Sequence, residues 1–244
     1  MTISIITISF NAKSTIEKTL QSVANQSYKN IEHIIVDGGS IDNTIEICNS
    51  YSHISKIISE QDKGVYDAFN KGLKIATGDI VGFLNADDTF YSENSIQDIV
   101  EAFKQNSVDI VYGNLNYINE EGKIIRNWIS RPYKKGLVNK AWMPAHPTFY
   151  CKKDIYDRLG DYNDSFKIAG DFELCLRFLE INNIPSYYLN KKLVNMLVGG
   201  ISNSGLSSKL TILKEELRAF KINERSINPI LFLLHKIKKL KQFI

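Results

Sequence analysis

Short apolar runs rich in β-branched residues alternate with helical patterns over the first 106 residues of the chain. We predict strands at residues 4–9, 31–36, 56–59 and 79–84. We predict helices at residues 14–24, 42–51, 65–76 and about 94–106. Strands that are apolar on both faces and separated by helices indicate βαβ units, which form a mostly parallel sheet covered by helices on both sides. The pattern therefore predicts an α/β fold.

The second half of the chain is less regular. We expect a hairpin between residues 111–118 and 123–128, and the later elements are a helix at 171–181, a strand at 186–197 and a helix at 207–223. With 244 residues, the chain is expected to hold between one and two domains. We predict one α/β domain at residues 1–205 and a helical, basic C-terminal extension at residues 206–244.

The charge of the chain divides at residue 209. Residues 209–244 carry nine Lys and Arg against three Glu, a local charge of +6, whereas the whole chain has a net charge of +3. The preceding body is therefore weakly acidic, which argues against a nucleic-acid-binding protein, because such a protein needs a basic face. The 43% of apolar residues is sufficient for a packed core.

Three features bear on the cellular compartment. The longest aliphatic or aromatic run, residues 230–234, is far shorter than the roughly 20 residues that span a bilayer. The first ten residues have no basic segment and no cleavage site, so they indicate a strand rather than a signal peptide. Three widely spaced cysteines are typical of buried thiols in a reducing compartment. We expect a cytoplasmic protein.

Small, polar or acidic residues follow each of the first four predicted strands. These strand ends are residues 9–11, 37–40, 60–64 and 85–88. In an open parallel sheet, ligands bind at the carboxyl ends of the strands. One such residue often belongs only to a turn, but four consecutive polar strand ends predict a binding site at one edge of the sheet.

Asp87 and Asp88 are the strongest single feature of this edge, because they directly follow the apolar run 80–84. Two adjacent carboxylates repel each other unless a cation neutralises them. Carboxylate oxygens suit Mg²⁺ or Mn²⁺, which proteins often hold with one or two carboxylates plus the phosphates of a substrate. The alternative is an N-cap pair for the next helix, although Ser92 and Asn94 lie nearer to that helix.

Two common phosphate-binding motifs are absent from the sequence. There is no Gly-x-Gly-x-x-Gly and no Gly-x-x-x-x-Gly-Lys-Ser/Thr. Neither a dehydrogenase-type dinucleotide site nor a P-loop is therefore predicted. A nucleoside diphosphate held through a metal ion remains as the expected ligand.

Five segments together carry a resemblance to a known family. Residues 4–11, 35–44 and 83–88 resemble the three opening motifs of the family 2 glycosyltransferases. Residues 62–72 are similar to the linker of that family into the fourth strand, and residues 169–177 to its acidic helix start. The resemblance covers about residues 2–205, with the motifs in the family's order.

The resemblance implies a GT-A fold and an inverting transfer of a sugar from a nucleotide-sugar donor, with a UDP-sugar as the commonest case. It also implies a divalent cation, Mn²⁺ or Mg²⁺, at the acidic motif. Asn85 stands at the first position of this motif, so Asp87 and Asp88 are left to bind the metal and position the ribose, and the motif does not divide these two roles. The implied donor-binding residues are Ile8, Phe10 and Asp37 at the nucleobase, Asp67 and Asn85 at the ribose or sugar, and Asp87.

The resemblance also implies an acceptor side. An acceptor hydroxyl needs a general base, and Asp171 is the candidate by its match to the family motif. Its alternative role is an N-cap of the following helix. Glu173 is the nearest rival for the base, and His146 is a candidate acceptor contact, although a single histidine is more often structural.

The end of the chain resembles a surface-active helix. Lys236, Lys238 and Lys239 lie off one apolar face, which comprises Ile230, Leu233, Leu234, Ile237, Leu240 and Ile244. A basic amphipathic helix is typical of a membrane-surface element or a partner helix; the alternative is a helix packed on the body. Because relatives act on polyprenyl-linked acceptors, we expect a glycan or polyprenyl-linked acceptor and peripheral contact of residues 229–244 with the inner face of the membrane.

Two other functions are alternatives to a glycosyltransferase. A sugar-phosphate nucleotidyltransferase shares a similar sheet and acidic metal site, but it should carry a Gly-rich, Arg-containing loop after the first strand, where this chain has Ser9-Phe-Asn-Ala-Lys13. A non-catalytic nucleotide-sugar-binding protein is the other alternative. Intact Asp87, Asp88 and Asp171 argue against a decayed site.

Overall fold

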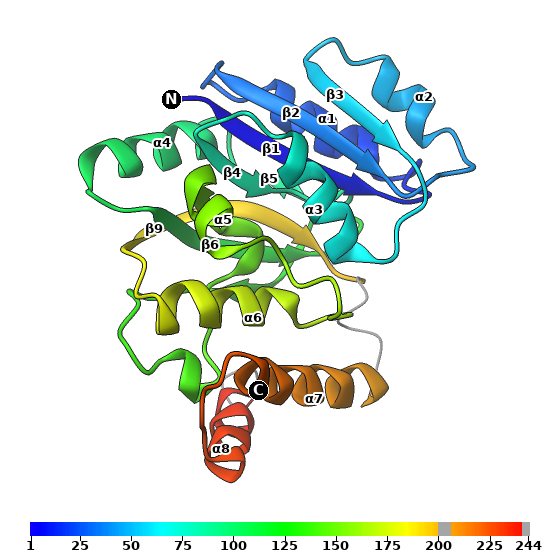
Figure 1. Cartoon of the computed structure of the whole chain (residues 1–244). Coiled ribbons are helices and arrows are strands. Elements are labelled where there is room, and N and C mark those ends of the chain that lie inside the picture. Colours follow the sequence, from blue (N-terminus) through cyan, green and yellow to red (C-terminus); the bar gives the residue numbers. More distant parts are fainter. Residues whose placement is uncertain (200–205, 241–244) are drawn as a thin grey trace.

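The computed structural model describes residues 1–199 and 206–240, and its centre is one mixed β-sheet (Figure 1). The order of the strands is β3-β2-β1-β4-β8-β6-β9-β5, and β7 pairs with β6 outside this path. The strands are β1 (Ile3–Ser9), β2 (Ile31–Asp37), β3 (Ile54–Ser59), β4 (Ile80–Phe83), β5 (Thr89–Phe90), β6 (Ile110–Ile118), β7 (Ile124–Trp128), β8 (Tyr150–Lys152) and β9 (Ser186–Leu197).

The first half of the sheet is parallel, as the sequence predicts. β1 pairs in parallel with β2 and β4, and β2 pairs in parallel with β3. The carboxyl ends of these strands therefore meet at one edge. The register places Ser9 beside Asp37, so the first two polar strand ends are neighbours.

The second half of the sheet is mixed, and two of its strands, β5 and β8, were not predicted. β8 runs antiparallel to both β4 and β6, whereas β6 and β9 are parallel. The two-residue strand β5 pairs with β9, and β7 forms the predicted hairpin with β6. The short elements β5, β8 and α5 (Lys153–Leu159) carry too few residues for a periodic signal.

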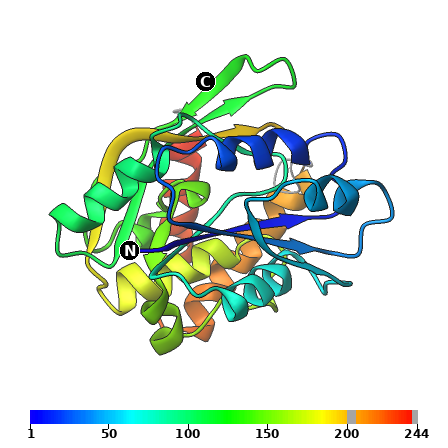
Figure 2. The ribbon, with the colours of Figure 1, turned by 90° about the horizontal axis from the view of Figure 1, so that it is seen from above.

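Helices cover both faces of the sheet (Figure 2). α3 (Val65–Ile75), α5 and α6 (Gly170–Cys175) contribute to one core cluster, whereas α1 (Ile16–Ala24), α2 (Thr44–Asn49) and α4 (Ser95–Gln105) pack on the other face. A π-helical turn, Leu176–Ile181, continues α6, and short 3₁₀ turns lie at Val138–Lys140 and His146–Thr148. Burial of the apolar stripe of each helix against the sheet drives this layering.

The observed helix starts decide three capping assignments that the sequence raised. α1 begins after Thr15 without a side-chain cap, so Ser14 and Glu17, which have the spacing of a capping box, do not form one. Asn94 is the N-cap position of α4, which removes the capping alternative for Asp87 and Asp88. Ala169 precedes α6, so Asp171 is not an N-cap either.

The C-terminal helices pack beneath the sheet domain in the view of Figure 1. α7 (Leu206–Ile222) contacts α6, and α8 (Pro229–Leu240) follows it. The rings of Phe220 and Phe232 lie 5.7 Å and 5.9 Å from the ring of Phe172, and all three belong to the main core cluster. Within the described ranges, no helix is both long and apolar enough to cross a bilayer.

Candidate active site

A cavity of about 770 Å³ opens at the carboxyl ends of β1, β2 and β4. Its wall also includes the start of α3, the η2 turn at His146–Thr148, the loop before α6 and the end of β9. Most of the predicted site residues line it, namely Ile8, Phe10, Asn85, Asp87, His146 and Asp171. The structure thus brings together residues from distant parts of the sequence.

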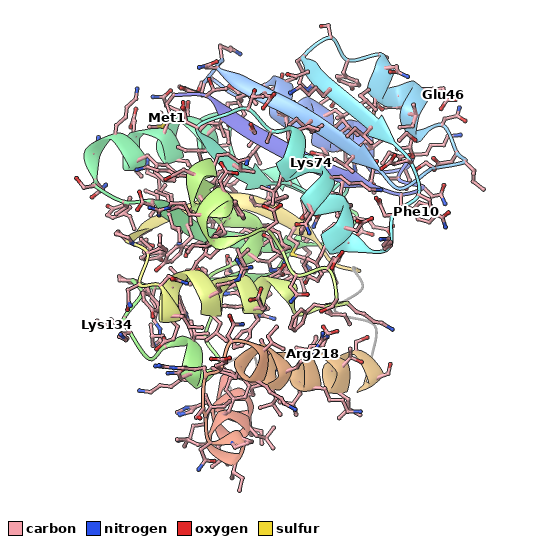
Figure 3. All side chains as sticks on the ribbon, in the orientation of Figure 1. Met1, Phe10, Glu46, Lys74, Lys134 and Arg218 are labelled. Atoms are coloured by element: carbon pink, nitrogen blue, oxygen red, sulfur yellow. The ribbon has the colours of Figure 1, made fainter. Side chains whose placement is uncertain are left out.

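Phe10 and Gly38 form one side of the cavity. Phe10, labelled in Figure 3, is 65% exposed at the end of β1. A Cβ at Gly38 would lie 2.9 Å from Asp62 Oδ2 and 3.3 Å from Phe10 Cδ2, so a larger residue here would require these side chains to shift. The result is a narrow site with an aromatic face and a carboxylate, which suits a planar base with N–H donors.

Asp37 does not face the cavity, in contrast to its expected contact with the nucleobase. It is fully buried, and its carboxylate accepts hydrogen bonds from Ser9, Ser40 and Ser59 and from the amide of Gly39. Burial alone would raise the pKa of Asp37, but the hydrogen bonds, above all those from Ser40, hold it below its usual value. Asp37 therefore fixes the loop that carries Gly38.

Asp67 also lies outside the cavity wall. Its carboxylate accepts the amide N–H of Lys63 over 3.0 Å, and Lys71 Nζ lies 3.6 Å from it. Lys71 also pairs with Asp62 at 2.7 Å and with Glu60 at 3.0 Å. In this structure Asp67 belongs to the loop between β3 and α3, where Lys71 connects three carboxylates, and its ribose contact stays a prediction.

The two aspartates after β4 lie in different environments. Asp87 lines the cavity, whereas Asp88 is 1% exposed and accepts hydrogen bonds from the amide of Leu197 at 3.1 Å and from Asn85 Nδ2 at 3.4 Å. Asp88 therefore joins the end of β4 to the end of β9. Only Asp87 presents its carboxylate to the cavity directly.

The electrostatics of this pair favour a cation. Burial raises the pKa of Asp87, and burial together with the charge of Asp87 raises the pKa of Asp88 well above its usual value. Across residues 1–199 and 206–240, no three or more His, Cys, Asp or Glu side chains are grouped to hold a metal. Two adjacent carboxylates nevertheless fit Mg²⁺ or Mn²⁺, because these ions take their remaining ligands from water and substrate phosphates.

Asp171 and His146 both line the cavity and face each other. Asp171 Oδ2 lies 3.7 Å from His146 Nδ1, and the side chain of Asp171 is 17% exposed. Burial raises the pKa of the Asp171 carboxyl, and His146 and the Tyr66 hydroxyl offset part of this rise. The Asp171 carboxylate can therefore accept a proton at a position that is largely shielded from solvent.

Glu173 does not reach the cavity, so the structure does not support its predicted acceptor-side role. It is 2% exposed and pairs with Arg177 through both oxygens, at 2.9 Å and 3.0 Å, while Asn223 Nδ2 donates to it at 3.1 Å. Arg177 in turn donates to the carbonyl groups of Leu159, Gly160 and Asp161. Glu173 therefore stabilises the turn after α5.

Several cavity residues were not singled out individually from the sequence, although Asp62 lies in the predicted polar strand end 60–64. Asp62 and Tyr66 lie in the segment 62–72, which carries part of the family resemblance, so their place in this motif was an available signal. Glu120 comes from the turn between β6 and β7, and Lys167 from the loop before α6. These two positions depend on tertiary contacts, and no periodicity or motif marks them.

Comparisons with known proteins show which family the chain resembles. The family model described as glycosyl transferase family 2 matches residues 4–168. An uncharacterized glycosyltransferase from Mycobacterium tuberculosis is 33% identical over 180 residues, which cover 72% of this chain and 68% of that protein. A UDP-Glc:alpha-D-GlcNAc-diphosphoundecaprenol beta-1,3-glucosyltransferase from Escherichia coli is 33% identical over 197 residues, which cover 76% of each chain.

Solved structures share the fold at low sequence identity. TarS from S. aureus has a TM-score of 0.71 at 17% identity, covering 98% of this chain and 72% of that chain. A mannosyltransferase from Pyrobaculum calidifontis, solved with GDP-Man and Mn²⁺, has a TM-score of 0.69 at 18% identity, covering 94% of this chain and 66% of that chain. These matches confirm the predicted GT-A fold.

Proposed function

Because this chain belongs to glycosyl transferase family 2 and is a glycosyltransferase, we propose that it transfers a sugar, with inversion, from a UDP-sugar to a hydroxyl of a lipid-linked glycan. The observation that carries this proposal is the single cavity shared by Phe10, Asp87 and Asp171. The ring of Phe10 suits a nucleobase, and Asp171 offers a proton acceptor in the same cavity. A nucleotidyltransferase would not need a general base at that place.

The proposed reaction is a single displacement. Asp171 accepts the proton of the acceptor hydroxyl, whose oxygen forms a bond with the anomeric carbon while the bond from that carbon to the donor phosphate breaks. The nucleoside diphosphate leaves with the bonding electrons. Attack from the face opposite the leaving group inverts the anomeric centre. His146, 3.7 Å from the Asp171 carboxylate, is placed to orient that carboxylate or the incoming hydroxyl.

The donor would lie along the strand ends. Phe10 and the backbone of Ile8 would contact the base, and Asn85 and Asp87 would lie near the ribose and diphosphate. Mn²⁺ or Mg²⁺ at Asp87, with Asp88 behind it, would stabilise the negative charge that develops on the leaving diphosphate. The Pyrobaculum structure with Mn²⁺ and the acidic pair of this chain support the cation.

The acceptor class is inferred from relatives and from charge. The Escherichia coli relative is named for a diphosphoundecaprenol acceptor. Helix α8 of this chain exposes Ile230 by 73%, Leu231 by 53% and Leu234 by 49%. Such an apolar group beside the exposed Lys238 suits the surface of an anionic bilayer. We therefore propose peripheral contact between α8 and the membrane that carries the acceptor.

The test is a transfer assay with a panel of donors. UDP-glucose, UDP-GlcNAc and GDP-mannose are offered with Mn²⁺ and a synthetic GlcNAc-diphospho-lipid, and nucleoside diphosphate release and the anomeric configuration of the product are measured. Asp171→Asn should reduce transfer by about 10²–10⁴-fold, while UDP affinity with Mn²⁺ stays unchanged. Full transfer by this variant would refute the base, and a product that retains configuration would refute the displacement.

A further inference from the structure

The loop before α6 forms part of the cavity wall and leads directly to Asp171. Lys167 and Ile168 line the cavity, and Ala169 occupies the N-cap position of α6. Because α6 has no side-chain cap, the position of its first turn depends on what holds this loop.

Glu215 of α7 accepts hydrogen bonds from three consecutive amides of this loop. The amide of Lys167 donates to Oε1 at 2.8 Å, and the amides of Ile168 and Ala169 donate to Oε2 at 2.9 Å and 2.8 Å. Glu215 is only 8% exposed. Hydrogen bonds from N–H groups to an ionised carboxylate are roughly twice as strong as those between neutral groups.

Two neighbours hold the same loop from other sides. The Tyr66 hydroxyl donates to the carbonyl of Ile168 at 2.7 Å. Arg218, one turn after Glu215 and labelled in Figure 3, donates to the carbonyl and hydroxyl of Ser165 at 3.1 Å and 2.6 Å. The guanidinium carbon of Arg218 also lies 4.7 Å from the centre of the Phe166 ring. Glu215 and Arg218 of α7 thus contact the loop at residues 165–169.

We propose that Glu215 is a positioning residue for the general base: its carboxylate fixes the loop 167–169 and thereby places Asp171 against the acceptor hydroxyl. This inference rests on the proposed function, because it assumes that Asp171 is the base. Glu215 lies outside residues 4–168, the part of the chain that the family model matches. Helix α7 then belongs to the active site rather than to an appendage.

Glu215→Gln is the sharpest variant, because it keeps the size of the side chain. A glutamine amide has one oxygen acceptor and one NH₂ donor group. Its nitrogen would face at least one of the three backbone N–H groups, which would lose its acceptor. A buried donor without a partner is unfavourable, so the loop should move away.

Glu216→Gln is the matched control. Glu216 is the next residue of α7 and is also buried, at 7% exposure, but its carboxylate pairs with Lys236 of α8. The control removes the same charge from the same helix, at a carboxylate whose ion pair is with α8. Both variants are compared with the full-length enzyme in one detergent-solubilised assay, so that membrane contact plays no part.

We expect Glu215→Gln to lower the turnover rate without weakening the binding of the donor. A misplacement of a catalytic group by about 1 Å can cost about 100-fold in rate, so kcat of Glu215→Gln should fall by about that factor. KM for the donor and the Kd for UDP with Mn²⁺ should not change. Hydrogen exchange of the amides of Lys167, Ile168 and Ala169 should accelerate in Glu215→Gln and not in Glu216→Gln.

Three outcomes would overturn the inference. One is an unchanged kcat in Glu215→Gln, and another is an equal loss in Glu216→Gln. The third is a loss of kcat that disappears when the rate is corrected for the folded fraction. If the wild type transfers no sugar from any donor, the proposed function fails, whereas the exchange rates of the three amides still report whether Glu215 holds the loop.

Discussion

At the scale of single residues, the predicted site residues fall into two groups. Some line the cavity, where a ligand can reach them, and others are buried and stabilise the surrounding loops. Phe10, Asp87 and Asp171 face the cavity. Asp37 and Glu173 are buried and fully engaged with neighbours. Acidic residues of similar appearance in the sequence therefore have different roles, and burial distinguishes them.

The pH dependence of transfer should report Asp171. The base must be ionised, and burial raises its pKa, so kcat/KM should begin to fall at a higher pH than an ordinary aspartate would give. His146 lowers this pKa, so His146→Ala should move the acidic limb of the profile to still higher pH. The measurement is kcat/KM against pH for both proteins.

His235→Ala on α8 is a suitable control for this profile, since His235 does not line the cavity. The limb should stay in place in this variant. A limb that moves to lower pH in His146→Ala, or does not move, would contradict the pairing of His146 with Asp171.

Asp88→Asn should stabilise the metal-free protein and abolish cation-dependent nucleotide binding. The pKa of Asp88 is higher in the folded state, so the free energy of unfolding falls as pH rises from the unfolded pKa toward the folded one. Removing this carboxyl should therefore raise Tm at neutral pH. Below the unfolded pKa, the two proteins should have similar Tm values.

Two measurements check the role of Asp88. Thermal unfolding is recorded against pH without metal, and UDP binding with Mn²⁺ is recorded by calorimetry. Asp154→Asn is the control, because the side chain of Asp154 is 63% exposed on α5. Unchanged UDP affinity in Asp88→Asn would show that the cation does not need this residue.

At the scale of elements, long periodic segments were predicted well. The strands β1, β2 and β4 and the helices α3 and α4 lie within a few residues of the predicted ranges. Because one or both faces of these elements are buried, their apolar side chains recur at regular spacings, and this periodicity can be recognised in the sequence. The predicted capping box at Ser14 is wrong. Thr15, one residue later, occupies the N-cap position of α1, and its side chain makes no capping hydrogen bond.

Short elements and loops were predicted poorly for a physical reason. β5 and β8 exist because they pair with β9 and with β4 and β6, partners distant in sequence. A strand of two or three residues has no periodic pattern of its own. The same holds for the loop 167–169, whose amides depend on Glu215 from another helix.

At the scale of the whole molecule, the C-terminal helices and the sheet domain share a core. Phe220 and Phe232 are 1% exposed and pack with Phe172 of α6. The division at residue 205 stays a prediction about folding units, and this packing argues against independent folding. Ile244, a member of the predicted apolar face, lies outside the described residues, which also exclude residues 200–205.

Membrane attachment should depend on the exposed side of α8. Deletion of α8 would remove Phe232 from the core, so Leu231→Glu with Leu234→Glu is the cleaner test. Burial of a leucine side chain contributes about 1.5–3 kcal/mol, so the double variant should bind liposomes containing phosphatidylglycerol at least about tenfold more weakly. Sedimentation at low and high salt measures it.

Ile41→Glu is the control for this change, because Ile41 is 93% exposed after β2 and does not belong to α8. Its liposome binding should match that of the wild type. Equal binding by the α8 double variant would show that α8 does not touch the bilayer.

The sequence by itself determined the α/β fold, the family and the sheet edge where the site lies, because apolar periodicity and strand-end motifs are local. Only the tertiary structure decided which carboxylates face the cavity: Asp87 and Asp171 do, and Asp37 and Glu173 do not. Exposure and hydrogen-bond partners arise from segments far apart in the chain. The role of Glu215 belongs to the same class, because its three partners lie nearly fifty residues before it.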